Sequence, residues 1–176
     1  MEGNQGQGTR MSDIAKATGI SRQALYLHFD ARTDLLIATT RYVDEVLGIE
    51  ALLEPSRNAA TGRERLNAYI AAVGTHFVEI QGLARAVLAI READVEMQIA
   101  WEERLAATRH GCLAAIRMLA DEGELADEWD IEIATDLLCL SLSFQSWDQL
   151  ININGWSVSE YVEHIQLQAK LSFLKH

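Results

Sequence analysis

The chain has 176 residues, of which 49% are hydrophobic and 23% are charged, and it contains a single proline. These values are typical of a folded globular protein of one or two domains and exclude a disordered chain. The sequence has no run of roughly 20 apolar residues for a membrane span and no signal-peptide core near its Gly/Gln-rich start, so we expect a cytoplasmic protein without membrane contact.

The net charge of −11 is unevenly distributed along the chain. Residues 1–48 hold five Lys or Arg and six Asp or Glu, whereas residues 49–176 hold ten and twenty. Because an acidic surface repels phosphates, binding to DNA would require a few well-placed cations in the nearly neutral N-terminal part. Any affinity for DNA is then expected to be modest and sensitive to salt.

The first 62 residues divide into a tail, a head and a connection. Residues 1–8 hold three glycines and almost nothing apolar, which predicts a flexible tail. The head, residues 9–48, is predicted to contain two short helices and then a longer one over about Arg32–Leu47. Turn-forming residues, among them Pro55, favour a connection over residues 49–62.

Beyond residue 62 the apolar residues follow the period of α-helices, which predicts a helical domain over residues 63–176. The predicted helices cover about Arg63–Ile80, Leu83–Glu92, Val95–Leu119, Ile131–Ile151 and Val158–Leu174. Gly82 is expected to end the first of them, and Ser157 with Glu160 forms a capping box at the start of the last. No alternating pattern is long enough for a strand. The predicted fold class is all-α, with a helical-bundle C-terminal domain.

The run Met11–Phe29, MSDIAKATGISRQALYLHF, has the spacing of a helix-turn-helix. Ala15 is small enough for two helices to approach closely, and Gly19 permits a sharp turn through a positive φ. Ile20 is expected to fill the elbow between the helices. The second helix, about Arg22–Phe29, would then enter the major groove of DNA.

Two further residues are expected to fix that second helix. Ser21 would cap it by accepting a hydrogen bond from a free backbone N–H. Leu25 would pack back onto Ile14 and close a small core.

The side chains of the second helix suit contact with DNA. Arg22 can bond guanine with two hydrogen bonds and Gln23 can do the same for adenine, while Ala24 allows close approach or contact with a thymine methyl. Tyr26 and His28 can donate hydrogen bonds to phosphates. Without the surrounding pattern, both could equally be surface aromatics of an ordinary helix.

Three short runs resemble the signature of the TetR family of transcriptional regulators: Gly19-Ile20-Ser21, Leu25-Tyr26-Leu27-His28-Phe29, and Arg32 followed by Leu35-Leu36. The resemblance covers about residues 9–48. It implies phosphate contacts by Thr9, Tyr26, His28 and Arg32 and base contacts by Arg22, Gln23 and Ala24, and Ser21 completes the expected DNA-binding set. Arg32 keeps the charge of the family's usual Lys, whereas Leu27 stands where a polar or basic residue is common.

Members of the family normally begin with an amphipathic helix that packs across the helix-turn-helix. Met1–Arg10 cannot supply an apolar stripe, so we expect this first helix to be missing, through truncation or a misplaced start. Apolar side chains such as Ile14, Leu25, Phe29 and Leu36 would then be partly uncovered, at a cost of about 1.5–3 kcal/mol for each one left fully exposed. We therefore expect a mobile head that binds DNA poorly.

The resemblance also implies that residues 63–176 bind a ligand and dimerise. The predicted helices near 131–151 and 158–174 are apolar around more than one face, which favours a homodimer and leaves open a core helix of a monomer. A small, mainly apolar effector would lie against Tyr69, His76, Phe77, Met97, Trp101, His110, Phe144, Gln145 and Trp147. Each aromatic could equally be plain core, and each buried histidine an ordinary hydrogen-bonded one.

The function implied by the resemblance is that of a repressor that binds a double-stranded DNA operator. A ligand that favours the wrong separation of two recognition helices would release it. The sequence has no nucleophile elbow, P-loop or H-E-x-x-H motif, so we expect no enzyme and no cofactor. Cys112 and Cys139 lie 27 residues apart without a C-x-x-C pattern, which indicates neither a metal nor a redox site. The alternative is a helical ligand-binding or interaction protein that no longer binds DNA.

Overall fold

The computed structural model describes residues 10–175, so the expected tail and Thr9 lie outside the described part. Within that part the regular structure is helical, apart from one isolated antiparallel bridge between Leu125 and Leu174. The all-α prediction is confirmed. None of the described helices is long and apolar enough to cross a membrane.

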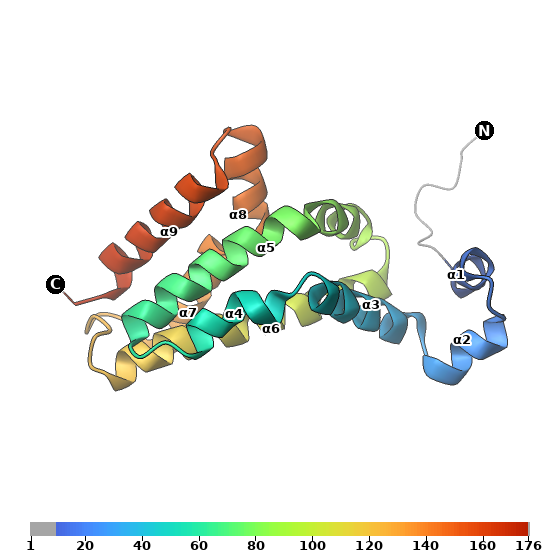
Figure 1. Ribbon diagram of the computed structural model, residues 1–176, viewed down its shortest axis with the longest axis horizontal. Helices are drawn as coiled ribbons and strands as arrows, with labels where there is room; N and C mark the ends of the chain where they lie inside the picture. Colours follow the sequence, from blue (N-terminus) through green and yellow to red (C-terminus); the bar gives the residue numbers. More distant parts are fainter. Residues whose placement is uncertain (1–9, 176) are drawn as a thin grey trace. The chain divides into compact units, whose positions relative to one another are not determined.

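Figure 1 shows the helices in chain order. They are α1 (Met11–Thr18), α2 (Arg22–His28), α3 (Arg32–Val46), α4 (Ile49–Arg57), α5 (Gly62–Ile90), α6 (Val95–Asp121), α7 (Ile131–Ser141), α8 (Phe144–Asp148), the π-helical turn η1 (Gln149–Ile153) and α9 (Val158–Phe173).

The chain divides into two compact units. Unit 1 comprises residues up to Val46 together with Leu83–Leu105, and unit 2 comprises Leu47–Gly82 together with residues from Ala106 onward. Helices α5 and α6 therefore each contribute residues to both units. The boundaries expected from the sequence differ, because they place Leu83–Leu105 outside the head.

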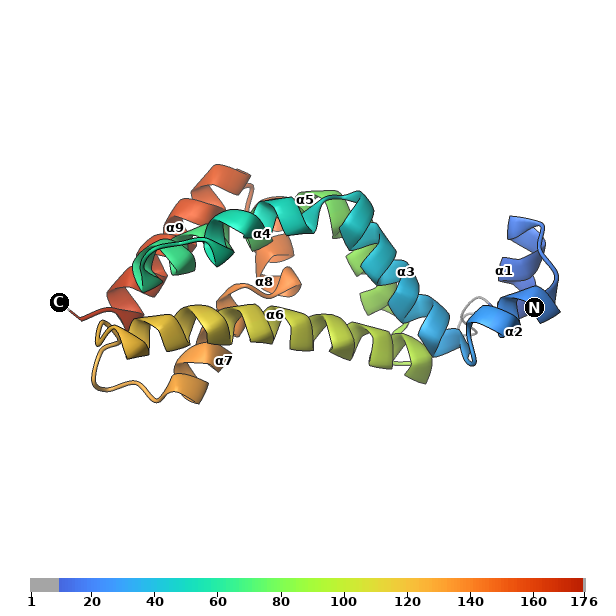
Figure 2. The same cartoon turned by 60° about the horizontal axis from the view of Figure 1, so that its bottom comes forward.

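In unit 2, α9 lies alongside the first part of α5 (Figures 1 and 2). The side-chain amide of Gln166 on α9 donates to the carbonyl of Asn67 on α5 at 2.9 Å. A Cβ placed on Gly74 of α5 would come within 3.0–3.1 Å of the Val162 and Tyr161 side chains. The small residue at position 74 thus lets the two helices approach closely.

Helix α7 packs against the second half of α6, as Figure 2 shows. The guanidinium of Arg109 on α6 donates to Asp136 at 2.9 Å and to Glu132 at 2.7 Å, both on α7. Ala134, Thr135 and Leu138 are buried on the opposite side of these charges, so α7 contributes an apolar stripe to the core of unit 2.

Two helices continue through a glycine or a proline at which the sequence predicts an end or a connection. Gly82 was expected to end a helix, but α5 continues to Ile90. A glycine inside a helix costs only about 1 kcal/mol, and the burial of Ala84 and Val87 beyond it outweighs that cost. Residues 49–62 were predicted to form a connection, but α4 occupies Ile49–Arg57 and contains Pro55.

The single helix predicted over Ile131–Ile151 is wrong as well, because it is broken after Ser141. Ser143 begins α8 and accepts a hydrogen bond from the N–H of Ser146 at 3.2 Å. Leu142 and Phe144 on either side are both buried, so the break leaves the apolar pattern continuous. Because the apolar residues continue across the break, the sequence pattern alone predicts a single helix over Ile131–Ile151.

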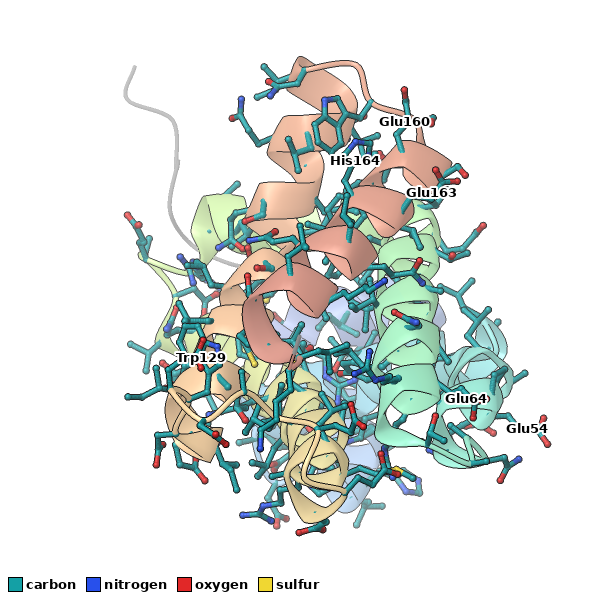
Figure 3. The ribbon with its side chains drawn as sticks, turned by 90° about the vertical axis from the view of Figure 1, so that its left-hand side faces the viewer. Glu54, Glu64, Trp129, Glu160, Glu163 and His164 are labelled. Atoms are coloured by element: carbon teal, nitrogen blue, oxygen red, sulfur yellow. The ribbon has the colours of Figure 1, made fainter. Side chains whose placement is uncertain are left out.

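The start of α9 confirms the capping box. Ser157 accepts from the N–H of Glu160 at 3.2 Å, and the Glu160 carboxylate accepts from the N–H of Ser157 at 2.7 Å. Figure 3 labels Glu160 at this end of the helix.

The other end of α9 is joined to the segment that follows α6. The N–H of Ala126 donates to the carbonyl of Phe173 at 2.9 Å, and the N–H of Lys175 donates to that of Glu124 at 3.0 Å. Trp129, labelled in Figure 3, donates its indole N–H to the carbonyl of Ser172 and meets the Phe173 ring edge to face at 5.5 Å.

Candidate nucleic-acid interface

The head turns sharply between α1 and α2, as Figure 1 shows. Gly19 adopts φ +74°, a conformation that an L side chain would strain, and the next N–H, that of Ile20, donates to Ala15 at 3.1 Å. Ser21 then caps α2 by accepting from the N–H of Ala24 at 3.0 Å. The predicted turn and cap are both confirmed.

A small apolar cluster holds the two helices together. Met11, Ala15 and Leu25 are buried, and Ile14, Phe29 and Leu35 pack against them while remaining partly exposed. The predicted packing of Leu25 near Ile14 is thus confirmed. Ile20 is 45% exposed, so the expectation that it fills the elbow is wrong, because Met11 and Leu25 close the cluster without it.

With Leu25 facing this cluster, α2 presents the rest of its surface outward. Arg22, Gln23, Tyr26 and Leu27 line a shallow depression of about 510 Å³. Positions 22 and 26, like 23 and 27, are four residues apart and therefore share one side of the helix. The Arg22 guanidinium lies over the Tyr26 ring at 5.4 Å, a cation–π contact that orients both side chains.

The other expected DNA-contacting residues lie around this surface. His28 is exposed at the C-terminal end of α2 and Ala24 is half-buried, whereas the hydroxyl of Ser21 is occupied by its cap. Leu27 is 84% exposed and adds an apolar side chain to the depression. It is not among the DNA-contacting residues predicted from the sequence.

Arg32 differs from the rest of the set because its guanidinium is already engaged. Its Nη1 donates to the two carboxylate oxygens of Asp94 at 2.8 and 2.7 Å and to Glu96 at 3.1 Å. The Arg32 side chain is only 13% exposed. A phosphate contact by Arg32 would therefore compete with the carboxylates of Asp94 and Glu96. The sequence pattern around Arg32 does not indicate these two contacts, because both carboxylates lie more than 60 residues away.

The residues expected to line a ligand site fall into both units. In unit 2, the rings of Phe77, Phe144 and Trp147 are mutually in contact, with centroids 5.6–5.9 Å apart. The Trp147 indole N–H donates to the carbonyl of Gly74 at 3.0 Å. These three rings form one buried aromatic cluster.

Four more of these residues belong to unit 2. Tyr69 is buried and donates its hydroxyl to the carbonyl of Thr108 at 2.9 Å, and its burial raises the pKa of the phenol. His76 is also buried. His110 and Gln145, the expected polar groups against an effector, are exposed and lie outside the buried aromatic cluster.

Met97 and Trp101 belong to unit 1. Met97 is half-buried, and Trp101 is only 8% exposed. The buried indole N–H of Trp101 has no acceptor among the described residues. Since a buried donor without a partner is costly, this position could receive an acceptor from a bound molecule. Within residues 10–175, no three His, Cys, Asp or Glu side chains are grouped so that they could hold a metal ion.

Comparison of the sequence with protein families connects this geometry to a known class. Residues 6–39 match the model of the bacterial regulatory proteins of the tetR family, and the matched residues include the whole of α1 and α2. The N-terminal head of the chain is therefore similar in sequence to the tetR-family regulators. Among curated proteins compared by sequence, none matches this chain.

Solved structures of transcriptional regulators share the fold. FadR from Bacillus subtilis in complex with stearoyl-CoA has 20% identity and a TM-score of 0.67, over 91% of this chain and 86% of that one. A putative transcriptional regulator from Saccharomonospora viridis in complex with choline has 17% identity and a TM-score of 0.69, over 96% and 88%. A TetR-family member from Streptomyces coelicolor A3 has 26% identity and a TM-score of 0.52, over 96% and 84%.

Proposed function

We propose that this protein is a transcriptional repressor of the TetR type that binds a duplex operator through α2 and leaves it when a small effector binds. The observation that carries the proposal is the exposed face of α2, where Arg22, Gln23 and Tyr26 project together from a helix fixed by the bend at Gly19. A helix presented in this way has the dimensions and donors to read a major groove.

Some side chains of α2 would contact bases and set the sequence specificity, and others would contact phosphates and set the position on DNA. Arg22 would bond a guanine and Gln23 an adenine, whereas Tyr26 and His28 would donate to phosphates. The contact between Arg22 and the Tyr26 ring supports this division, because it restricts the guanidinium before DNA arrives.

A dimer would present two such helices to half-sites about 34–36 Å apart. Apolar side chains on α7 and α9 support dimerisation through these helices: Leu140 is 64% exposed and Leu171 58%, and Ile133 and Leu167 are also exposed. Burying such side chains against a second copy would stabilise the pair by about 25 cal/mol for each Å² of apolar surface. Sedimentation analysis tests this directly, because Leu140→Glu and Leu171→Glu are both expected to give monomers.

The effector is proposed to be small and mainly apolar, with an acceptor for a hydrogen bond. Trp101 in unit 1 supports both features, because its ring is buried and its indole N–H has no acceptor among the described residues. The related structures suggest two first probes of different chemistry, stearoyl-CoA and choline.

The experiment is a selection of bound duplexes from a random pool, followed by anisotropy titrations of the selected duplex and of a scrambled one. Arg22→Ala is expected to weaken binding to the selected duplex by about 1–3 kcal/mol and to have little effect on the scrambled duplex. Tyr26→Phe should weaken both by the same factor, because a phosphate contact carries no sequence information. Arg57→Ala, an exposed arginine of unit 2, is the control.

Two outcomes would contradict parts of the proposal. If no duplex is enriched although the chain still binds a probe, the protein is the ligand-binding alternative. If a probe binds but leaves the affinity for DNA unchanged, release by that molecule is excluded, since coupling between two sites must be reciprocal.

A further inference from the structure

Leu27 on α2 has the largest exposed fraction, 84%, among the large hydrophobic side chains of the described residues. A single exposed leucine is ordinary on a protein surface. Leu27, however, lines the same shallow depression as Arg22, Gln23 and Tyr26, the side chains proposed to face DNA. Its place among these polar groups therefore calls for an explanation that exposure alone does not give.

Leu27 faces away from the packed core of the head. Leu25 is the residue of α2 that is buried in the small apolar cluster, against which Ile14, Phe29 and Leu35 pack. Position 27 lies two residues, or about 200°, further round the helix from position 25. Replacement of Leu27 is therefore expected to leave the head folded, so that any effect on binding can be measured.

The chemistry of a leucine side chain restricts what it can contact on DNA. It has no donor for a phosphate oxygen and no donor or acceptor for the polar groups of the base edges. In the major groove, the base edges display one methyl group, at C5 of thymine, and apolar side chains contact it. Thymine is thus the base that Leu27 can distinguish from the other three.

The position of Leu27 on α2 also limits where that thymine can lie. Gln23 and Leu27 are four residues apart on one side of the helix, a rise of about 6 Å. Successive base pairs are about 3.4 Å apart along the DNA axis. The thymine is therefore expected within about two base pairs of the base that Gln23 contacts.

We propose that Leu27 is a specificity-determining residue that selects a thymine in each half-site through its C5 methyl group. This assignment rests on the proposed binding of DNA by α2 and adds a base preference that the hydrogen bonds of Arg22 and Gln23 do not supply. A polar or basic residue is common at this position in the family that the head resembles, so the preference is a property of this chain.

The test is a uracil scan of the duplex selected with the complete chain. Each thymine is replaced in turn by uracil, which keeps the base pair and the O4 acceptor and removes only the methyl group. In anisotropy titrations, wild type is expected to bind about fourfold more weakly when one particular thymine of a half-site is replaced, which is the effect of one buried methylene.

Leu27→Ala should bind the unsubstituted duplex about fourfold more weakly than wild type does. At the thymine that Leu27 contacts, this variant should bind the thymine and uracil duplexes equally, because the side chain that senses the methyl group is gone. A thymine contacted by Ala24 would keep its sensitivity in Leu27→Ala, which separates the two residues.

Two control variants accompany the scan. Leu27→Met keeps an apolar side chain of similar volume and should retain the sensitivity to uracil. Ile153→Ala shortens another exposed hydrophobic side chain, in unit 2, and should change neither the affinity nor the scan. Thermal melts of all the variants should agree with wild type, since both positions are exposed.

Two results would overturn the role of Leu27 while leaving the proposed function intact. One is a selected duplex, weakened by Arg22→Ala, in which every thymine that responds to uracil in wild type still responds in Leu27→Ala, or in which none responds at all. The other is an equal loss of affinity for the selected and scrambled duplexes in Leu27→Ala, because that loss carries no base preference. Failure to select any duplex would overturn the proposed function and this assignment together.

Discussion

Arg32 at the start of α3 and Asp94 just before α6 form an ion pair in which one guanidinium nitrogen contacts both carboxylate oxygens, at 2.8 and 2.7 Å. The two side chains are only 13% and 9% exposed, so water screens their attraction weakly. The pair connects α3, the helix that follows α2, with another segment of unit 1.

We expect this pair to contribute measurably to stability. In a double-mutant cycle of Arg32→Ala and Asp94→Ala, the coupling in the free energy of unfolding should be about 1–3 kcal/mol, since removing one partner leaves the other poorly solvated. Urea denaturation of the four proteins measures it.

The pair between Arg57 and Glu50 is the matched control, because both of its side chains are more than half exposed. Its coupling should be about 0–1 kcal/mol. Equal couplings for the two pairs would show that burial does not strengthen the contact of Arg32 with Asp94.

Glu103 should make the stability of the protein depend on pH. Burial alone would raise its pKa, but hydrogen bonds from Arg41 and Arg104 outweigh that effect and lower the pKa below 4.5. A carboxylate whose pKa is lowered by folding stabilises the folded state above the unfolded pKa, and this contribution is lost as the pH falls through the folded value. Urea midpoints measured from neutral pH to below 4.5 should therefore fall less steeply in Glu103→Gln than in wild type.

Arg41→Gln is the companion variant, since it keeps the carboxyl and removes one of its donors. Its acid dependence should lie between those of wild type and Glu103→Gln. An acid profile of Glu103→Gln that parallels wild type would mean that other carboxylates dominate the loss of stability.

Two helical glycines should respond to alanine in opposite directions. A Cβ on Gly111 would lie 2.3 Å from the ring of Tyr69, whereas a Cβ on Gly82 would have nothing within 4 Å. Gly82→Ala is expected to stabilise the protein by about 0.5–1 kcal/mol, because alanine loses less backbone entropy in a helix. Gly111→Ala should destabilise it by about 1–3 kcal/mol through overpacking. Thermal melts of the two variants give the signs, and a stabilising Gly111→Ala would contradict the close packing of Tyr69.

The cap of α9 at Ser157 should contribute more to stability than the serine two residues further along, Ser159. Ser157→Ala is expected to cost about 1 kcal/mol, since it removes the acceptor for the N–H of Glu160. Ser159 is exposed and donates only to Glu163, at 3.0 Å, so Ser159→Ala should change the free energy of unfolding by less than about 0.5 kcal/mol. Similar losses in the two variants would show that the capping box does not stabilise α9.

The features predicted correctly from the sequence depend on neighbouring residues. The turn at Gly19 and the caps at Ser21 and Ser157 follow from local hydrogen bonds within a few residues, and the structure contains all three. The exposed face of α2 also follows from helical period once Leu25 is assigned to the core.

What the sequence could not supply are contacts between distant segments. The carboxylates around Arg32 lie 62 and 64 residues away, on and just before α6. The break between α7 and α8 near Leu142 could not be predicted either. The apolar residues follow the same pattern whether or not the helical backbone hydrogen bonds are interrupted at Ser143. In each case the deciding interaction depends on how helices pack, which no local pattern encodes.

Two backbone bonds, from Ala126 to Phe173 at the end of α9 and from Lys175 just beyond it to Glu124, make Trp129 a built-in optical probe. Its indole is held by the carbonyl of Ser172 and the ring of Phe173, so unwinding of that final turn would move the ring into water and shift its fluorescence to longer wavelength. A carboxypeptidase digestion followed by emission spectra, with the other three tryptophans replaced by phenylalanine, would then report fraying of this end without any added dye.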